Sequence, residues 1–105
     1  MAKKVHLSHP GVILKEMFLD DMDVKPAVLA RALGVTRSSV SKILSGQRDV
    51  TAETSLRLGL FFDQSPEFWL NLQKRYDIEK ARMENMTAFR KIVVPYTALT
   101  ETAGA

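Results

Sequence analysis

The pattern of small and apolar residues between positions 26 and 44 limits the fold more than any other feature of this sequence. Ala30 lies in the last turns of a first expected helix, and Gly34 follows its final residue. Val40 and Ile43 share one face of a second expected helix. A small residue lets two helices approach closely, and glycine provides the left-handed backbone that ends a helix abruptly. This spacing predicts a helix-turn-helix.

Helical periodicity also covers most of the remaining chain of 105 residues, and strand patterns are nearly absent. Cap residues such as Thr36, Thr51 and Ser65 mark helix starts. The expected helices cover residues 10–19, 26–33, 37–45, 52–62 and 66–83. The sequence therefore predicts an all-α, five-helix domain at residues 1–86. A carboxy-terminal extension, residues 87–105, is expected to be partly extended or disordered, because β-branched residues 92–94 precede a proline.

Several classes of function lack the residues that they need. The chain has no cysteine, which excludes disulfides, thiol nucleophiles and cysteine-based zinc sites. No glycine-rich phosphate loop, nucleophile elbow or catalytic triad is recognisable. His6 and His9 have no third ligand nearby, so no metal site is predicted. We expect neither an enzyme nor a cofactor. The apolar runs are too short for a membrane helix, which needs about 20 residues, and no secretory signal is visible. We expect a cytoplasmic protein.

The distribution of charge is more informative than the net charge of +3. Between positions 25 and 48 there is no acidic residue, and the basic residues are Lys25, Arg31, Arg37, Lys42 and Arg48. The face of the second helix opposite Val40 and Ile43 is centred on Ser38 and Lys42. A solvated helix face usually mixes glutamate with lysine, whereas hydroxyls and arginine can contact base edges in the major groove. The pattern favours a nucleic-acid-binding face over a generic solvated one.

The same residues carry a resemblance to a known family. The runs LARALGV (residues 29–35) and VSKIL (residues 40–44), followed by Gly46, resemble the XRE (lambda-repressor-like) helix-turn-helix proteins. The flanking run HPG (residues 9–11) and the block SPEFWLNLQ (residues 65–73) are similar to those of HigA-type antitoxins. The resemblance covers about residues 9–82.

This resemblance implies a dimeric, sequence-specific DNA-binding antitoxin that represses its own operon and neutralises a HigB-like ribonuclease toxin. It implies a lambda-repressor-like domain in which Lys25 and Arg48 bind phosphates. The residues that would face the major groove are Thr36, Arg37, Ser38, Ser39 and Lys42. Pro26 departs from the family, which often has a glutamine there, so one usual phosphate contact has no side-chain donor in this chain.

Two further surfaces follow as expectations. Trp69, Leu72 and Tyr76 form an apolar stripe on the fifth helix, and we expect a homodimer through it. Its two recognition helices would lie about 34 Å apart on a palindromic operator of double-stranded DNA. A basic toxin should bind an acidic surface, so Asp20, Asp21 and Asp23 are the expected toxin-binding residues. Residues 92–94 are the other option, as an edge strand for the toxin.

Two other functions stay open. The first is a stand-alone helix-turn-helix regulator without a toxin, which the neighbouring gene would distinguish. The second is a protein-interaction module that has kept the fold but lost DNA binding. Acidic or bulky apolar residues on the outer face of residues 37–45 would favour this module, and the sequence has none there.

Overall fold

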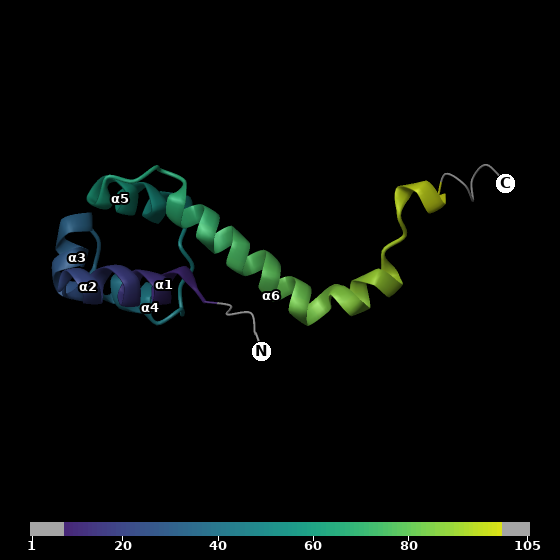
Figure 1. The fold of residues 1–105 in the computed structure, drawn as a ribbon, viewed down its shortest axis with the longest axis horizontal. Coiled ribbons are helices and arrows are strands. Elements are labelled where there is room, and N and C mark those ends of the chain that lie inside the picture. Colours follow the sequence, from purple (N-terminus) through teal and green to yellow (C-terminus); the bar gives the residue numbers. More distant parts are fainter. Residues whose placement is uncertain (1–7, 100–105) are drawn as a thin grey trace.

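The computed structural model describes residues 8–99 of the chain, and all of the regular structure within them is helical. The expected all-α class and the five helices of the domain are confirmed. The first helix is one continuous run of three segments, and four more helices follow it. In chain order the elements are α1 (Pro10–Ile13), η1 (Leu14–Leu19), α2 (Asp20–Met22), α3 (Pro26–Leu33), α4 (Arg37–Leu44), α5 (Ala52–Phe62) and α6 (Phe68–Ile92). Figure 1 shows the elements from α1 to α5 gathered into one body, from which α6 projects.

The first helix begins where the sequence predicts and ends later. His9 is its N-cap, with Nδ1 accepting a hydrogen bond from the Gly11 N–H at 2.9 Å, and Pro10 follows at the first helical position. The predicted end at residue 19 is wrong, because the helical backbone continues to Met22. Asp23 then takes the left-handed conformation (φ 56°) and ends the helix. Asp20 and Asp21 therefore lie inside the last turn of the first helix.

The start of α6 is capped by a residue from another helix. The sequence predicts Ser65 as its cap, but α6 begins at Phe68, after a turn over residues 65–67. The hydroxyl of buried Ser55, on α5, accepts from the Leu70 N–H at 3.0 Å and donates to the Pro66 carbonyl at 2.6 Å. Because this hydroxyl satisfies a free N–H of the first turn, the position of α6 is tied to α5.

Helix α6 continues beyond its predicted end near residue 83 to Ile92, and thus across the expected boundary after residue 86. Residues 87–92 of the extension, which was expected to be partly extended or disordered, are helical. The physical reason is that residues 84–92 contain no glycine or proline, and the helix ends shortly before Pro95. Residues 93–95 lie outside helices, and residues 96–99 form a helical turn. Residues 100–105 of the expected extension lie outside the described residues.

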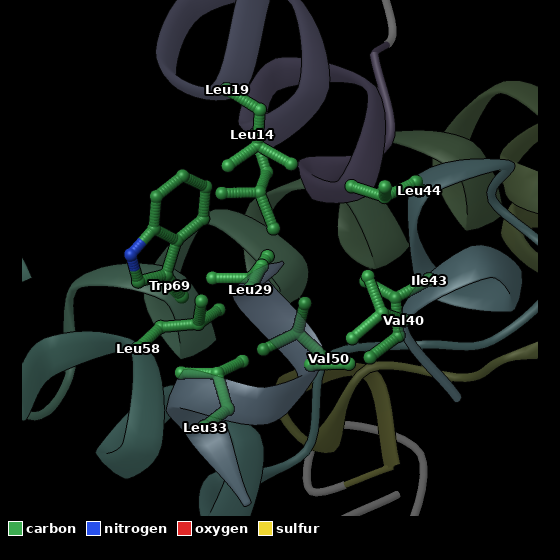
Figure 2. Packing of buried hydrophobic residues seen from close by; sticks show 11 residues of the cluster. Leu14, Leu19, Leu29, Leu33, Val40, Ile43, Leu44, Val50, Leu58 and Trp69 are labelled. Carbon is green, nitrogen blue, oxygen red and sulfur yellow. The ribbon is translucent and has the colours of Figure 1, made fainter. Parts of the chain in front are cut away.

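The core lies between the first helix, α3, α4, α5 and the beginning of α6. Figure 2 shows Trp69 next to Leu58 and Leu29 in this packing. The Trp69 indole N–H donates to the Gln64 side-chain oxygen at 2.7 Å, so its polar atom is satisfied. No described helix is both long and apolar enough to cross a membrane. The buried apolar residues are Leu14, Leu19, Leu29, Ala30, Leu33, Val40, Ile43, Leu44, Val50, Leu58 and Trp69.

Candidate nucleic-acid interface

The turn between α3 and α4 determines how α4 is presented. Gly34 has φ +76°, which a side chain would disfavour, and the Val35 N–H donates to the Ala30 carbonyl at 3.0 Å. Thr36 is the N-cap of α4, and its Oγ1 accepts from the Ser39 N–H at 3.0 Å. The helix-turn-helix predicted from the sequence is therefore confirmed, with the expected glycine and cap in place.

The buried side of α4 leaves the opposite side to solvent. Val40, Ile43 and Leu44 point into the core. On the other side Ser38 and Lys42 are exposed, and so are Ser41 and Ser45. This arrangement places a row of small hydroxyl side chains around a lysine, with no bulky residue to keep the helix axis away from a groove.

Arg37 lies in the first turn of α4 and is exposed. Within residues 8–99, no carboxylate lies within 4.0 Å of Arg37, Lys42 or Arg48. The charges of these cations are therefore available to an anionic ligand.

Ser39 and Arg48 are engaged with each other. An Arg48 guanidinium nitrogen donates to the Ser39 hydroxyl at 2.8 Å, and the Thr36 hydroxyl donates to the same oxygen at 2.9 Å. Ser39 is half-buried. The hydroxyl groups of Thr36 and Ser39 are thus occupied within the protein. Those of Ser38 and Ser41 have no side-chain hydrogen-bond partner within residues 8–99 that would compete with a base.

Lys25 lies at the other end of the motif, directly before α3. It is exposed, and its backbone forms the N-cap of α3 without a side-chain cap bond. Pro26 occupies the first helical position, as predicted. Lys25 and the positive end of the α3 dipole would both attract a phosphate placed there.

Two residues that hold this interface were not identified from the sequence as parts of it. The Val50 N–H donates to the Oε1 of Gln73 at 2.8 Å, across 23 residues, and His9 Nε2 lies 3.4 Å from Asp49 Oδ1, across 40 residues. The only sequence signal is the resemblance itself, since His9 and Gln73 both belong to the runs that carry it.

Gly11 is a third such residue. A Cβ atom on Gly11 would overlap the carbonyl group of Ile43, in the last turn of α4. Helix α1 therefore packs with its backbone directly against α4, and the run HPG combines a cap with this close approach.

The expected dimer residues lie mainly inside the protomer. Trp69 is fully buried, so its assignment to a dimer interface is wrong. Leu72 is half-buried against the core, and the ring of Tyr76 packs edge-on against His9 at 5.2 Å between centroids. The helical spacing of the stripe was correct, but the protomer's own helices cover it.

The expected toxin-binding residues lie at the end of the first helix, and all three are exposed. The Lys15 ammonium lies 3.5 Å from the Asp20 carboxylate, which partly neutralises it. Asp21 and Asp23 make no ion pair with a described basic residue. His6 of the rejected metal pair lies outside the described residues.

Comparisons with known proteins agree with this geometry. The model of the helix-turn-helix family matches residues 19–69. Virulence-associated protein I of Dichelobacter nodosus is 38% identical over 87 residues, which are 83% of this chain and 79% of that protein. Antitoxin HigA-1 of Vibrio cholerae serotype O1 is 38% identical over 72 residues, covering 69% of this chain and 68% of that protein. The solved structure of Pseudomonas aeruginosa antitoxin HigA with the higBA promoter has a TM-score of 0.82 and 40% identity, covering 87% of this chain and 99% of that one.

Proposed function

Because the chain belongs to the HigA-type antitoxins of the helix-turn-helix family, we propose that it is a sequence-specific DNA-binding repressor. It represses its own operon and acts as the antitoxin of a HigB-like ribonuclease toxin. The family is not enzymatic, and no cofactor takes part. The protein works in the cytoplasm, where a repressor meets the DNA it controls. The observation that carries the proposal is the exposed, acid-free face of α4, whose cations have no carboxylate partner among the described residues.

In this proposal α4 is the recognition helix and enters the major groove. Arg37 reaches a base edge, where its guanidinium can make a bidentate contact to guanine, and Ser38 and Lys42 face the groove beside it. Lys25 and Arg48 hold the phosphate backbone on either side. Thr36 and Ser39 support this surface through the cap of α4 and through the bond to Arg48.

The direct test is a gel-shift of the full chain against the DNA upstream of its own gene, at several salt concentrations. We expect a specific complex that survives an excess of unrelated DNA and weakens steeply with salt. Binding of both DNAs with equal affinity would contradict sequence-specific repression.

We expect a homodimer, because a single recognition helix contacts too few base pairs of DNA to give a specific affinity. With Trp69 buried, we place the dimer contact on the part of α6 beyond the body, which Figure 1 shows projecting away from it. Ile78, Phe89 and Ile92 are 57%, 48% and 71% exposed there. Phe89 and Ile92, which are three residues apart, share one helical face. A second copy that packs on this stripe would cover it.

Changing both Phe89 and Ile92 to glutamate should convert the dimer to a monomer, because like charges would face each other across an apolar contact. We expect monomer mass in sedimentation at micromolar concentration and a loss of operator affinity of at least about 10-fold. Lys91→Glu is the matched control, since it adds negative charge to the same turn without removing apolar area. An unchanged dimer in the double variant would place the interface elsewhere.

The toxin surface remains on the acidic end of the first helix. Asp21 and Met22 lie one turn beyond Phe18, whose ring packs against Phe62 at 5.1 Å between centroids. Met22 is 57% exposed, so an apolar side chain lies among these carboxylates. A basic partner would contact this side chain while its cations face the carboxylates.

Replacing Asp20, Asp21 and Asp23 by lysine should abolish copurification of the toxin encoded beside this gene and its neutralisation in growth assays. Operator binding should persist, because the recognition helix is unchanged. Undiminished toxin binding would move the contact to residues 92–94. A neighbouring product that never copurifies with the unmodified protein would leave a stand-alone repressor.

A further inference from the structure

The loop that follows the recognition helix is fixed at both ends by residues distant in the sequence. This loop, residues 45–50, carries Arg48. At its beginning, the His9 side chain lies against Gly46, since a Cβ placed on Gly46 would be 3.7 Å from the His9 Cβ and Cγ. The His9 Nε2 also lies 3.4 Å from the Asp49 carboxylate. Because the His9 Nδ1 accepts the Gly11 N–H, the ring proton is on Nε2 and points at Asp49.

At the end of the loop, Gln73 of α6 provides the second anchor. Its side chain is 2% exposed, and its Oε1 accepts the Val50 N–H at 2.8 Å. Its Nε2 donates to the Asp77 carboxylate at 2.9 Å. Asp77 accepts only, so this second bond determines which end of the amide faces Val50. Gln73 is therefore oriented as well as buried.

These anchors determine where Arg48 can lie. Val50 is itself buried in the core, two residues after Arg48. The Arg48 N–H donates to the Lys42 carbonyl at 3.1 Å, and the guanidinium donates to Ser39 at 2.8 Å. The backbone and the side chain of Arg48 are thus both held in place before DNA binds, and the guanidinium lies beside the first turns of α4.

We propose that Gln73, oriented by Asp77, and His9 are positioning residues for the contact of Arg48 with the DNA backbone. Neither residue touches DNA; both hold the loop so that the guanidinium stands in the place where a phosphate passes α4. An arginine loses much rotamer freedom when it binds, and here that loss occurs on folding. The inference rests on the proposed function, in which Arg48 binds a phosphate.

A double-mutant cycle separates positioning from a merely structural role. Operator affinity is measured for the full chain and for Gln73→Leu, each with Arg48 and with Arg48→Ala. We expect Gln73→Leu to weaken binding about 10-fold when Arg48 is present and less than about 2-fold when it is absent, because residues in one network are not additive. Gln73→Leu should also reduce the slope of log affinity against log salt concentration by about one, as the loss of one phosphate contact does.

Milder variants keep the test decisive if Gln73→Leu folds poorly. Asp77→Ala removes an exposed side chain and frees the amide of Gln73, while His9→Asn keeps a side chain that can cap a helix but lacks the reach to Asp49. Both should lower affinity about 3-fold, only when Arg48 is present. Asn71→Ala, an exposed neutral site on α6, is the control and should change nothing.

Two results would overturn the proposal. Equal losses with and without Arg48, at an unchanged salt slope, would show that Gln73 acts only on stability. An Arg48→Ala variant with full affinity would show that no contact exists to be positioned. Failure of the unmodified chain to bind its operator is a different result, because it contradicts the proposed function itself.

Discussion

Replacing Arg37 and Lys42 together with alanine is expected to weaken operator binding on the order of 100-fold. Both side chains are exposed on the outward face of α4 and lack a carboxylate partner among the described residues. A contact to a base edge contributes about 1–3 kcal/mol, and about 1.4 kcal/mol corresponds to a factor of ten. Two such contacts give the expected loss, and most of it should be a loss of discrimination between operator and unrelated DNA.

The measurement is a titration of operator and unrelated DNA at matched salt. Lys80→Ala with Lys91→Ala is the control, because it removes the same charge from exposed positions on α6. This control should affect both DNAs slightly and alike. Arg48→Ala should also weaken both DNAs alike and reduce the salt slope by about 1, as expected for a phosphate contact. An unchanged operator affinity in the Arg37 and Lys42 variant would exclude α4 as the recognition helix.

The Gly11→Ala change should cost about 3 kcal/mol of the free energy of unfolding. The new methyl group would overlap the Ile43 carbonyl, which is backbone and cannot rotate away. Either α1 or the end of α4 must shift, and overpacking of this kind costs roughly 1–3 kcal/mol, occasionally more. A shift of α4 would also displace the recognition helix, so operator affinity should fall in the fraction that stays folded.

Urea unfolding followed by circular dichroism measures this loss. Glu16→Ala, an exposed site on the same helix, should change the free energy of unfolding by no more than about 0.5 kcal/mol. A loss below about 1 kcal/mol for Gly11→Ala would mean that α1 and α4 do not approach as closely as the structure places them.

Local patterns predicted the helices and the motif because their causes are local. Thr36 and Thr51 each cap a helix with a hydroxyl that accepts an N–H three residues later, and Gly34 takes the positive φ that ends α3. These interactions lie within a few residues, so composition and spacing suffice to recognise them. The acid-free face of α4 follows equally from helical period.

The sequence by itself determined the helix-turn-helix, its outward cations and the family that they indicate. Only the tertiary structure decided which surface covers each apolar stripe and which residues hold the recognition helix in place. Spacing put Trp69 on a face of α6 but could not say that α5 and the first helix would cover it. Ser55 caps α6 across 15 residues, and Gln73 anchors Val50 across 23. Such contacts depend on how helices cross, and crossing is determined by the packing of the whole core rather than by any one segment.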